Sequence, residues 1–137
     1  MIAIIRISGH VKLNERYEEM LFRLRLRKKY TCIVLPETKE LKANLQELRN
    51  LIAYGKISPE TLKLLIEKRG KPLSPNKKVD VSKALEALEK KGLASAGVKP
   101  FFRLHPPRGG IDSKLHYPKG ILGDNKEDIN ELIRRML

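Results

Sequence analysis

The chain has 137 residues, the size of one domain, and 41% of them are hydrophobic, which excludes a chain that is disordered throughout. Its 29 Lys and Arg residues outnumber its 16 Asp and Glu residues and give a formal net charge of +13. Such an excess opposes compaction unless a polyanion neutralises it, so the composition favours a nucleic-acid partner. A thermophile-type surface is an alternative explanation for many charged residues, but such surfaces tend to balance the two signs, and this one does not. No apolar run is long enough to span a membrane.

Cys32 is the single cysteine, which excludes an intrachain disulfide and a multi-cysteine zinc site. It lies within an apolar run, where a buried and inert thiol is typical. The first ten residues, MIAIIRISGH, are interrupted too soon to form a signal peptide. We therefore expect a protein of the reducing cytoplasm.

The N-terminal part of the chain predicts a strand followed by a helix. Residues 2–7 read IAIIRI, a β-branched apolar run that is typical of a shielded, central strand. Asn14 can cap the helix that follows, and glutamates suit its first turn. The far end of this helix carries five cations in seven residues, more than the helix dipole requires.

A second strand, a second helix and a third strand complete the first 58 residues. Residues 30–35 read YTCIVL and end at a proline, which predicts a strand. Thr38 can cap a helix whose apolar face extends to Ile52, and residues 53–57 predict a short strand. The order of elements in this part of the chain is therefore β-α-β-α-β.

The remaining residues predict three helices and a long basic loop. A serine cap with a proline in the first turn predicts a helix over residues 59–69. After a basic linker, apolar periodicity predicts helices over residues 80–91 and 125–136. Between these two helices, residues 98–122 form the basic loop.

The centre of this loop, residues 101–122, reads FFRLHPPRGGIDSKLHYPKGIL. Its prolines and glycines interrupt both helix and strand, so we expect an irregular, extended segment. The Lys, Arg and His side chains can donate hydrogen bonds to phosphates, and the glycines allow close approach of the backbone. This pattern favours a segment that lies along a folded RNA.

A nuclease is the catalytic alternative for the same loop. His105 and His116 could act as general acid and base, with Arg103 or Lys119 stabilising the charged transition state. No carboxylate is placed obviously to orient either imidazole ring. Three scattered histidines and one cysteine also lack the spacing of metal ligands, so no metal site is expected.

Nucleotide-cofactor and sequence-reading motifs are missing from the sequence. No P-loop and no GxGxxG motif after a strand is present, so we expect no cofactor and no small-molecule substrate. Residues 2–7 contain no aromatic residue that could stack on a base, unlike the strands of an RNA-recognition motif. This difference favours recognition of the shape and phosphates of structured RNA.

Several segments taken together resemble a known family. The chain is similar to the archaeal and eukaryotic form of the large-subunit ribosomal proteins called L-thirty in bacteria and L-seven in eukaryotes. The similarity covers nearly the whole chain in order. The segments that carry it are MIAIIRISG, LRLRKKYTCIVLPET, YGKIS, SPETLKLLIEKRG, FRLHPPRGG and INELIRRM.

The resemblance implies an α+β fold related to the ferredoxin-like fold. Residues 1–58 would form a β-α-β-α-β core, with a three-stranded antiparallel sheet, the first strand in the middle and helices on one face. Residues 59–137 would form a mostly helical and extended addition packed on or beside this core. The implied protein has no catalytic residues. It binds large-subunit ribosomal RNA near the 5S RNA region, with ribosomal proteins as possible neighbours, in the cytoplasm.

We therefore expect a structural constituent of the large ribosomal subunit that stabilises folded ribosomal RNA. A free-standing RNA-binding regulator stays open as an alternative, because the same charges would support it. Weaker candidates for RNA contact are Arg6, His10 and Lys12, around the turn between the first strand and the first helix. The main candidates are Arg25, Arg27, Lys28, Lys29, Arg103, His105, Arg108, Gly109, Gly110, Lys114, His116 and Lys119.

Overall fold

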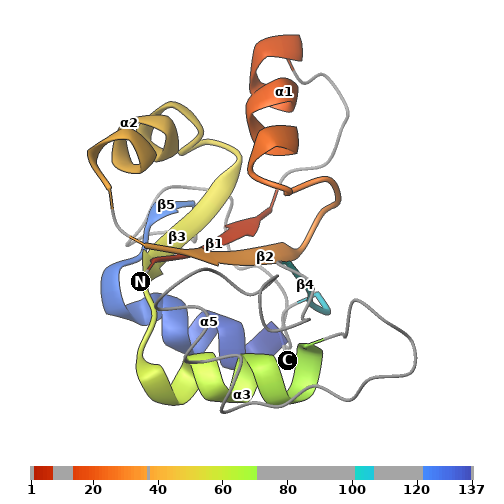
Figure 1. Cartoon of the computed structure of the whole chain (residues 1–137), viewed down its shortest axis with the longest axis vertical. Coiled ribbons are helices and arrows are strands. Elements are labelled where there is room, and N and C mark those ends of the chain that lie inside the picture. Colours follow the sequence, from red (N-terminus) through yellow and green to blue (C-terminus); the bar gives the residue numbers. More distant parts are fainter. Residues whose placement is uncertain (1, 8–13, 37, 71–100, 107–121, 137) are drawn as a thin grey trace.

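The protein is a five-stranded sheet between two layers of helices (Figure 1). The computed structural model describes residues 2–7, 14–36, 38–70, 101–106 and 122–136. In Figure 1, α1 and α2 lie above the sheet, and α3 and α5 lie below it. The elements are β1 (Ile2–Arg6), α1 (Glu15–Arg23), β2 (Thr31–Leu35), α2 (Lys39–Glu47), β3 (Ile52–Lys56), α3 (Pro59–Arg69), β4 (Phe102–Arg103), β5 (Gly123–Asp124), a 3-10 turn (Lys126–Asp128) and α5 (Ile129–Met136).

β1 is the middle strand of an antiparallel core, as predicted. Ile4 is opposite Ile33 of β2 on one side and opposite Tyr54 of β3 on the other. All five residues of β1 are buried, including Arg6. The continuous apolar run is therefore explained by helices on both faces of the strand.

Two short strands widen the sheet from three strands to five, in the order β4-β2-β1-β3-β5. β4 pairs antiparallel with β2, and β5 pairs parallel with β3. The prediction that residues 101–122 contain no regular strand is therefore wrong at Phe102–Arg103. These two residues lie between Pro100 and Pro106, and the fully buried Phe102 side chain holds them against the edge of β2.

Both predicted caps of the core helices are confirmed. Asn14 accepts a hydrogen bond from the Arg16 backbone N–H at 3.0 Å, and Thr38 accepts one from the Leu41 N–H at 3.2 Å. The apolar faces of α1 and α2 pack in one cluster with the upper face of the sheet. The second helix is shorter than predicted, because it ends at Glu47 and Ile52 opens β3 instead.

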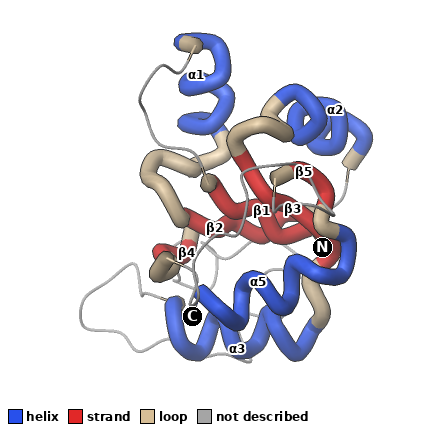
Figure 2. The backbone as a smooth tube through the Cα atoms, turned by 180° about the vertical axis from the view of Figure 1, so that it is seen from behind, coloured by secondary structure: helices blue, strands red, loops and turns tan. Residues whose placement is uncertain are grey.

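The other face of the sheet is covered by α3 and α5, which lie side by side (Figure 2). The predicted Ser58 cap is confirmed by a hydrogen bond from the Thr61 N–H at 3.3 Å. The last helix begins later than predicted, at Ile129, because Lys126 has a φ of 51° within the preceding 3-10 turn. The apolar cluster on this face combines residues of β1 and β2 with Phe102 and residues of α3 and α5.

The predicted helix over residues 80–91, the linker before it and most of the loop over residues 98–122 lie outside the described residues. The division of the chain at residues 58 and 59 therefore stays a prediction. Within the described ranges, no helix is both long enough and apolar enough to cross a membrane.

Candidate nucleic-acid interface

The loop that follows α1 carries the first group of predicted RNA-binding cations. The Leu26 N–H donates to the Leu21 carbonyl at 2.9 Å, and the Arg25 N–H donates to the Phe22 carbonyl at 3.0 Å. Arg25 has a φ of 65°, and Leu21 and Leu26 are both fully buried. These features form a Schellman motif, in which a left-handed residue ends the helix. The cations at positions 25–29 therefore lie on a loop, and the prediction that they form the end of the helix is wrong.

A buried arginine holds this loop against the sheet. Arg6 is 1% exposed, and its Nη1 donates to the Leu26 carbonyl at 2.6 Å. Burial lowers the pKa of the Arg6 guanidinium from its ordinary value, and the carboxylate of Glu18 partly opposes this effect. Arg6 was a weaker candidate for RNA contact. Its burial argues against a phosphate contact and makes it a positioning residue for the loop.

The far end of the loop is fixed by two backbone hydrogen bonds of Tyr30. Its N–H donates to the Arg6 carbonyl at 2.7 Å, and its carbonyl accepts from the Leu104 N–H at 3.1 Å. Tyr30 has a φ of 64°, which turns the chain from the loop into β2. The second bond also ties the loop to the residues that follow β4.

Pairing of β4 with β2 brings Arg103 beside the loop after α1. Thr31 and Arg103 are opposite each other in the sheet. Together the two segments enclose a pocket of ≈ 270 Å³ that we call the four-cation pocket. Its described lining contains no carboxylate, so the cations reinforce one another and raise the local positive potential. The lining residues are Arg25, Arg27, Lys28, Thr31, Phe101 and Arg103.

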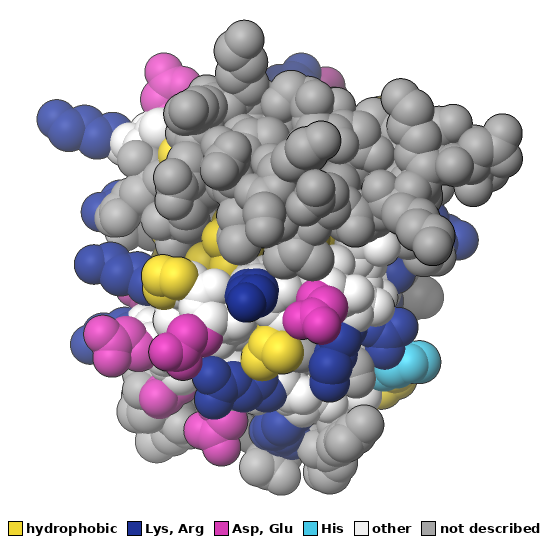
Figure 3. Space-filling model, turned by 60° about the horizontal axis from the view of Figure 1, so that its bottom comes forward, with side chains coloured by type: hydrophobic (Ala, Val, Ile, Leu, Met, Phe, Trp, Pro, Cys, Tyr) yellow, Lys and Arg dark blue, Asp and Glu magenta, His cyan; other side chains and the backbone are white. Residues whose placement is uncertain are grey.

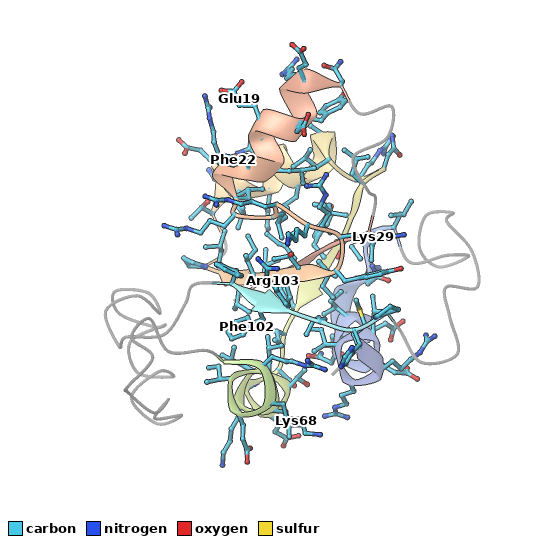
Figure 4. The ribbon with its side chains drawn as sticks, turned by 90° about the vertical axis from the view of Figure 1, so that its right-hand side faces the viewer. Glu19, Phe22, Lys29, Lys68, Phe102 and Arg103 are labelled. Atoms are coloured by element: carbon cyan, nitrogen blue, oxygen red, sulfur yellow. The ribbon has the colours of Figure 1, made fainter. Side chains whose placement is uncertain are left out.

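Aromatic rings lie among these cations. The Arg27 guanidinium is 4.4 Å from the centre of the Phe22 ring, and the Arg103 guanidinium is 5.7 Å from that of Phe101. Phe22 is 56% exposed. Figure 4 shows Phe22 at the lower end of α1 and Arg103 at the edge of the sheet beneath it. Sequence reasoning missed both rings, because it looked for aromatic residues only on the first strand.

The helical layer formed by α3 and α5 differs from the four-cation pocket in its charge pattern. On the face shown in Figure 3, Lys and Arg side chains are interspersed with Asp and Glu side chains. α3 carries Lys68 and Arg69 in its last turn and Glu60 in its first. A mixed pattern of this kind is typical of an ordinary solvated surface. The four-cation pocket is therefore the better candidate for binding a polyanion.

Comparison with known proteins gives relatives that match over nearly their full length. The chain is 40% identical to large ribosomal subunit protein uL30 of Archaeoglobus fulgidus, over 99% of both chains. It is 36% identical to the uL30 protein of Methanosphaera stadtmanae over the whole of both chains, and 32% identical to that of Nanoarchaeum equitans over 100% and 99%. The chain belongs to the uL30 family. No family model matches it.

Membership of the uL30 family confirms the resemblance stated from the sequence segments, since this family is the one called L-seven and L-thirty. The α+β fold and the antiparallel core with its first strand in the middle are confirmed as well. The core helices α1 and α2 lie together on one face, as expected. The helices α3 and α5 cover the other face.

The structure brings together only some of the predicted contact residues of this uL30-family chain. Arg25, Arg27, Lys28 and Arg103 share the four-cation pocket, whereas Lys29 and His105 are exposed but do not line it. The Lys29 ammonium is 5.1 Å from the centre of the Tyr30 ring. The backbone N–H of His105 donates to the Met136 carbonyl at 2.9 Å. The candidates that lie outside the described residues are His10, Lys12, Arg108, Gly109, Gly110, Lys114, His116 and Lys119.

The catalytic alternative needs both His105 and His116, and His116 lies outside the described residues. In the described ranges, no three His, Cys, Asp or Glu side chains are grouped so that they could hold a metal ion. Cys32 is fully buried, and burial raises the pKa of its thiol to about 12. A thiol with this pKa stays protonated and is a poor nucleophile.

Proposed function

We propose that this uL30-family protein is a non-catalytic, structural component of the large ribosomal subunit in the cytoplasm, where it binds folded ribosomal RNA. The names of its relatives support the ribosomal role. The observation that supports RNA contact is the four-cation pocket. Two segments that are distant in the sequence form this pocket, and its described lining contains no carboxylate. The family resemblance supports a location near the 5S RNA region, with other ribosomal proteins as neighbours.

The proposed mechanism is electrostatic. The pocket cations displace counterions from RNA phosphates, and the folded core fixes where these charges lie. Each neutralised phosphate contributes about 0.7–0.9 to the slope of log affinity against log salt concentration. If the four cations each neutralise one phosphate, the pocket accounts for a slope of roughly 3. Binding should therefore weaken steeply as salt rises.

The test is cosedimentation of the full chain with large ribosomal subunits across a salt series. We expect stoichiometric binding that weakens at high salt. A double charge reversal in the pocket, Arg27→Glu with Arg103→Glu, should release the protein at lower salt. The matched control is Lys63→Glu with Lys68→Glu, which removes the same charge from exposed positions of α3 and should behave like the unmodified chain.

Three results would contradict the proposal. A protein that stays in the supernatant while still binding RNA would favour the free-standing regulator. Equal release of the two double variants would show that net charge, and not the pocket, determines binding. Cleavage of the RNA during the incubation would favour the nuclease.

A further inference from the structure

We propose that the four-cation pocket is a nucleotide site, which takes one unpaired RNA base on the ring of Phe101 while its cations hold the flanking phosphates. This inference rests on the proposed function and adds the kind of RNA feature that is recognised. The observation that carries the inference is that an aromatic residue, Phe101, lines a pocket whose other side chains are mostly cations. Cations alone suffice for the backbone of a duplex, whose bases are already stacked on one another.

The ring of Phe101 offers a surface on which a base can stack. Its ring is partly buried and packs against the apolar cluster beneath α1 and α2, while it also lines the pocket. The fully buried Phe102 next to it fixes the backbone at the sheet edge. The ring is therefore anchored on its inner side and accessible from the pocket. Base stacking on an aromatic ring fixed in this way tolerates any base, because every base has a π face.

Arg103 can cover the second face of the base. Its guanidinium is 5.7 Å from the Phe101 ring centre, near the outer limit of about 6 Å for a cation–π contact. The Arg103 side chain is exposed and comes from an edge strand, so a small movement away from the ring opens room for a flat group. A base between the two would stack on the ring on one side and on the guanidinium plane on the other.

The size and charge of the pocket fit one nucleotide. Its volume of ≈ 270 Å³ lies just below the usual range of about 300–1,000 Å³ for small-molecule sites. This volume suits a single base with its sugar. Arg25, Arg27 and Lys28 line the same pocket and can contact the phosphates on either side of that base.

Phe22 offers a matched comparison within the same chain. It is also an aromatic residue beside an arginine, Arg27, and it is 56% exposed, but it does not line the pocket. Single exposed apolar side chains are common on protein surfaces and need no function. If the pocket is the nucleotide site, substitution of Phe101 should therefore matter and the same substitution of Phe22 should not.

The experiment uses two RNA hairpins that differ by one bulged adenosine, measured at low ionic strength with the full chain. We expect the bulged hairpin to bind about tenfold more tightly than the fully paired one, in line with the stacking of one base. Phe101→Leu keeps the apolar packing and should bind both hairpins at the level of the paired one, with an unchanged salt slope. Phe22→Leu should keep the preference.

A spectroscopic readout tests stacking directly. The chain contains no tryptophan, so Phe101→Trp places one fluorophore at the proposed site. The bulged hairpin should quench its fluorescence more strongly than the paired hairpin does. Equal affinity of the unmodified chain for both hairpins, or a preference that survives Phe101→Leu, would overturn the nucleotide site while the RNA-binding proposal stands. Failure to bind either hairpin at low ionic strength would overturn the RNA-binding proposal itself.

Discussion

Replacement of Arg25 by glycine should stabilise the fold and weaken RNA binding. Arg25 is the left-handed residue of the Schellman motif that ends α1, with a φ of 65°. Glycine is preferred at this position, and the left-handed conformation costs other residues about 1–2 kcal/mol. The extra chain entropy of glycine in the unfolded state offsets about 0.5–1 kcal/mol of this gain. Arg25→Gly should therefore raise the free energy of unfolding by about 0.5–1 kcal/mol.

The same substitution removes one of the four pocket cations. If Arg25 neutralises one phosphate, the slope of log affinity against log salt should fall by about 0.7–0.9. Urea denaturation measures the change in stability, and RNA binding across a salt series measures the change in slope. The two quantities should move in opposite directions, which is the expected sign of a residue retained for function at the expense of stability.

Lys28→Gly is the matched control for this experiment. Lys28 is also exposed and lines the same pocket, but it is not among the described residues with a positive φ. Its replacement removes the same charge and introduces the same glycine entropy without relieving strain, so it should lower stability by roughly 0.5–1 kcal/mol. If Arg25→Gly is no more stable than Lys28→Gly, the argument from backbone strain is refuted. If Arg25→Gly binds RNA with an unchanged salt slope, the phosphate contact is refuted.

Three further substitutions test the interior of the fold. Arg6→Met should lower the free energy of unfolding by about 1–3 kcal/mol, because the buried Leu26 carbonyl loses its donor; urea denaturation checks this, and an unchanged midpoint would contradict it. Gly55→Ala should cost about 1–3 kcal/mol, because a Cβ would collide with the Lys126 carbonyl and force the 3-10 turn away from β3, and an unchanged melting temperature would contradict it. Cys32 has a folded pKa of about 12 against an ordinary value of 9.0, so between these values the unfolded thiol loses its proton and the folded thiol does not. Stability should therefore fall with rising pH by about 1.4 kcal/mol per unit in that window, and Cys32→Val should remove this part of the slope.

The sheet core and its helices could be predicted from local sequence patterns. The apolar run at residues 2–7 predicted the central strand, and Asn14 and Thr38 predicted the helix starts, because these signals depend on residues next to one another. The short strands β4 and β5 could not be predicted, since each has only two residues and depends on an open sheet edge. Family-level similarity supplied the order of elements but not these pairings.

The candidate site was predictable in its residue types and not in its geometry. Arginine favours helix, so the repeated cations after Phe22 suggested that α1 continues, whereas the left-handed Arg25 ends it. The pairing of β4 with β2 then decides that Arg103 joins the loop cations and that Phe101 lines the pocket with them. Tertiary pairing of distant segments leaves no local signal of this kind, although the adjacency of phenylalanine and arginine in both segments was visible in the sequence.

The loop between α1 and β2 is held at both ends by hydrogen bonds to Arg6, which bears on the proposed binding. Arg25 and Tyr30 both have left-handed φ values, which cost about 1–2 kcal/mol each and persist only where the surrounding structure determines them. Here Arg6 provides these constraints. Its side chain donates to the Leu26 carbonyl, and its backbone carbonyl accepts from the Tyr30 N–H. Mutual repulsion of Arg25, Arg27 and Lys28 would otherwise spread a free loop. If the protein binds RNA as proposed, cations that the fold already holds together would lose less conformational entropy on binding than those of a flexible basic loop.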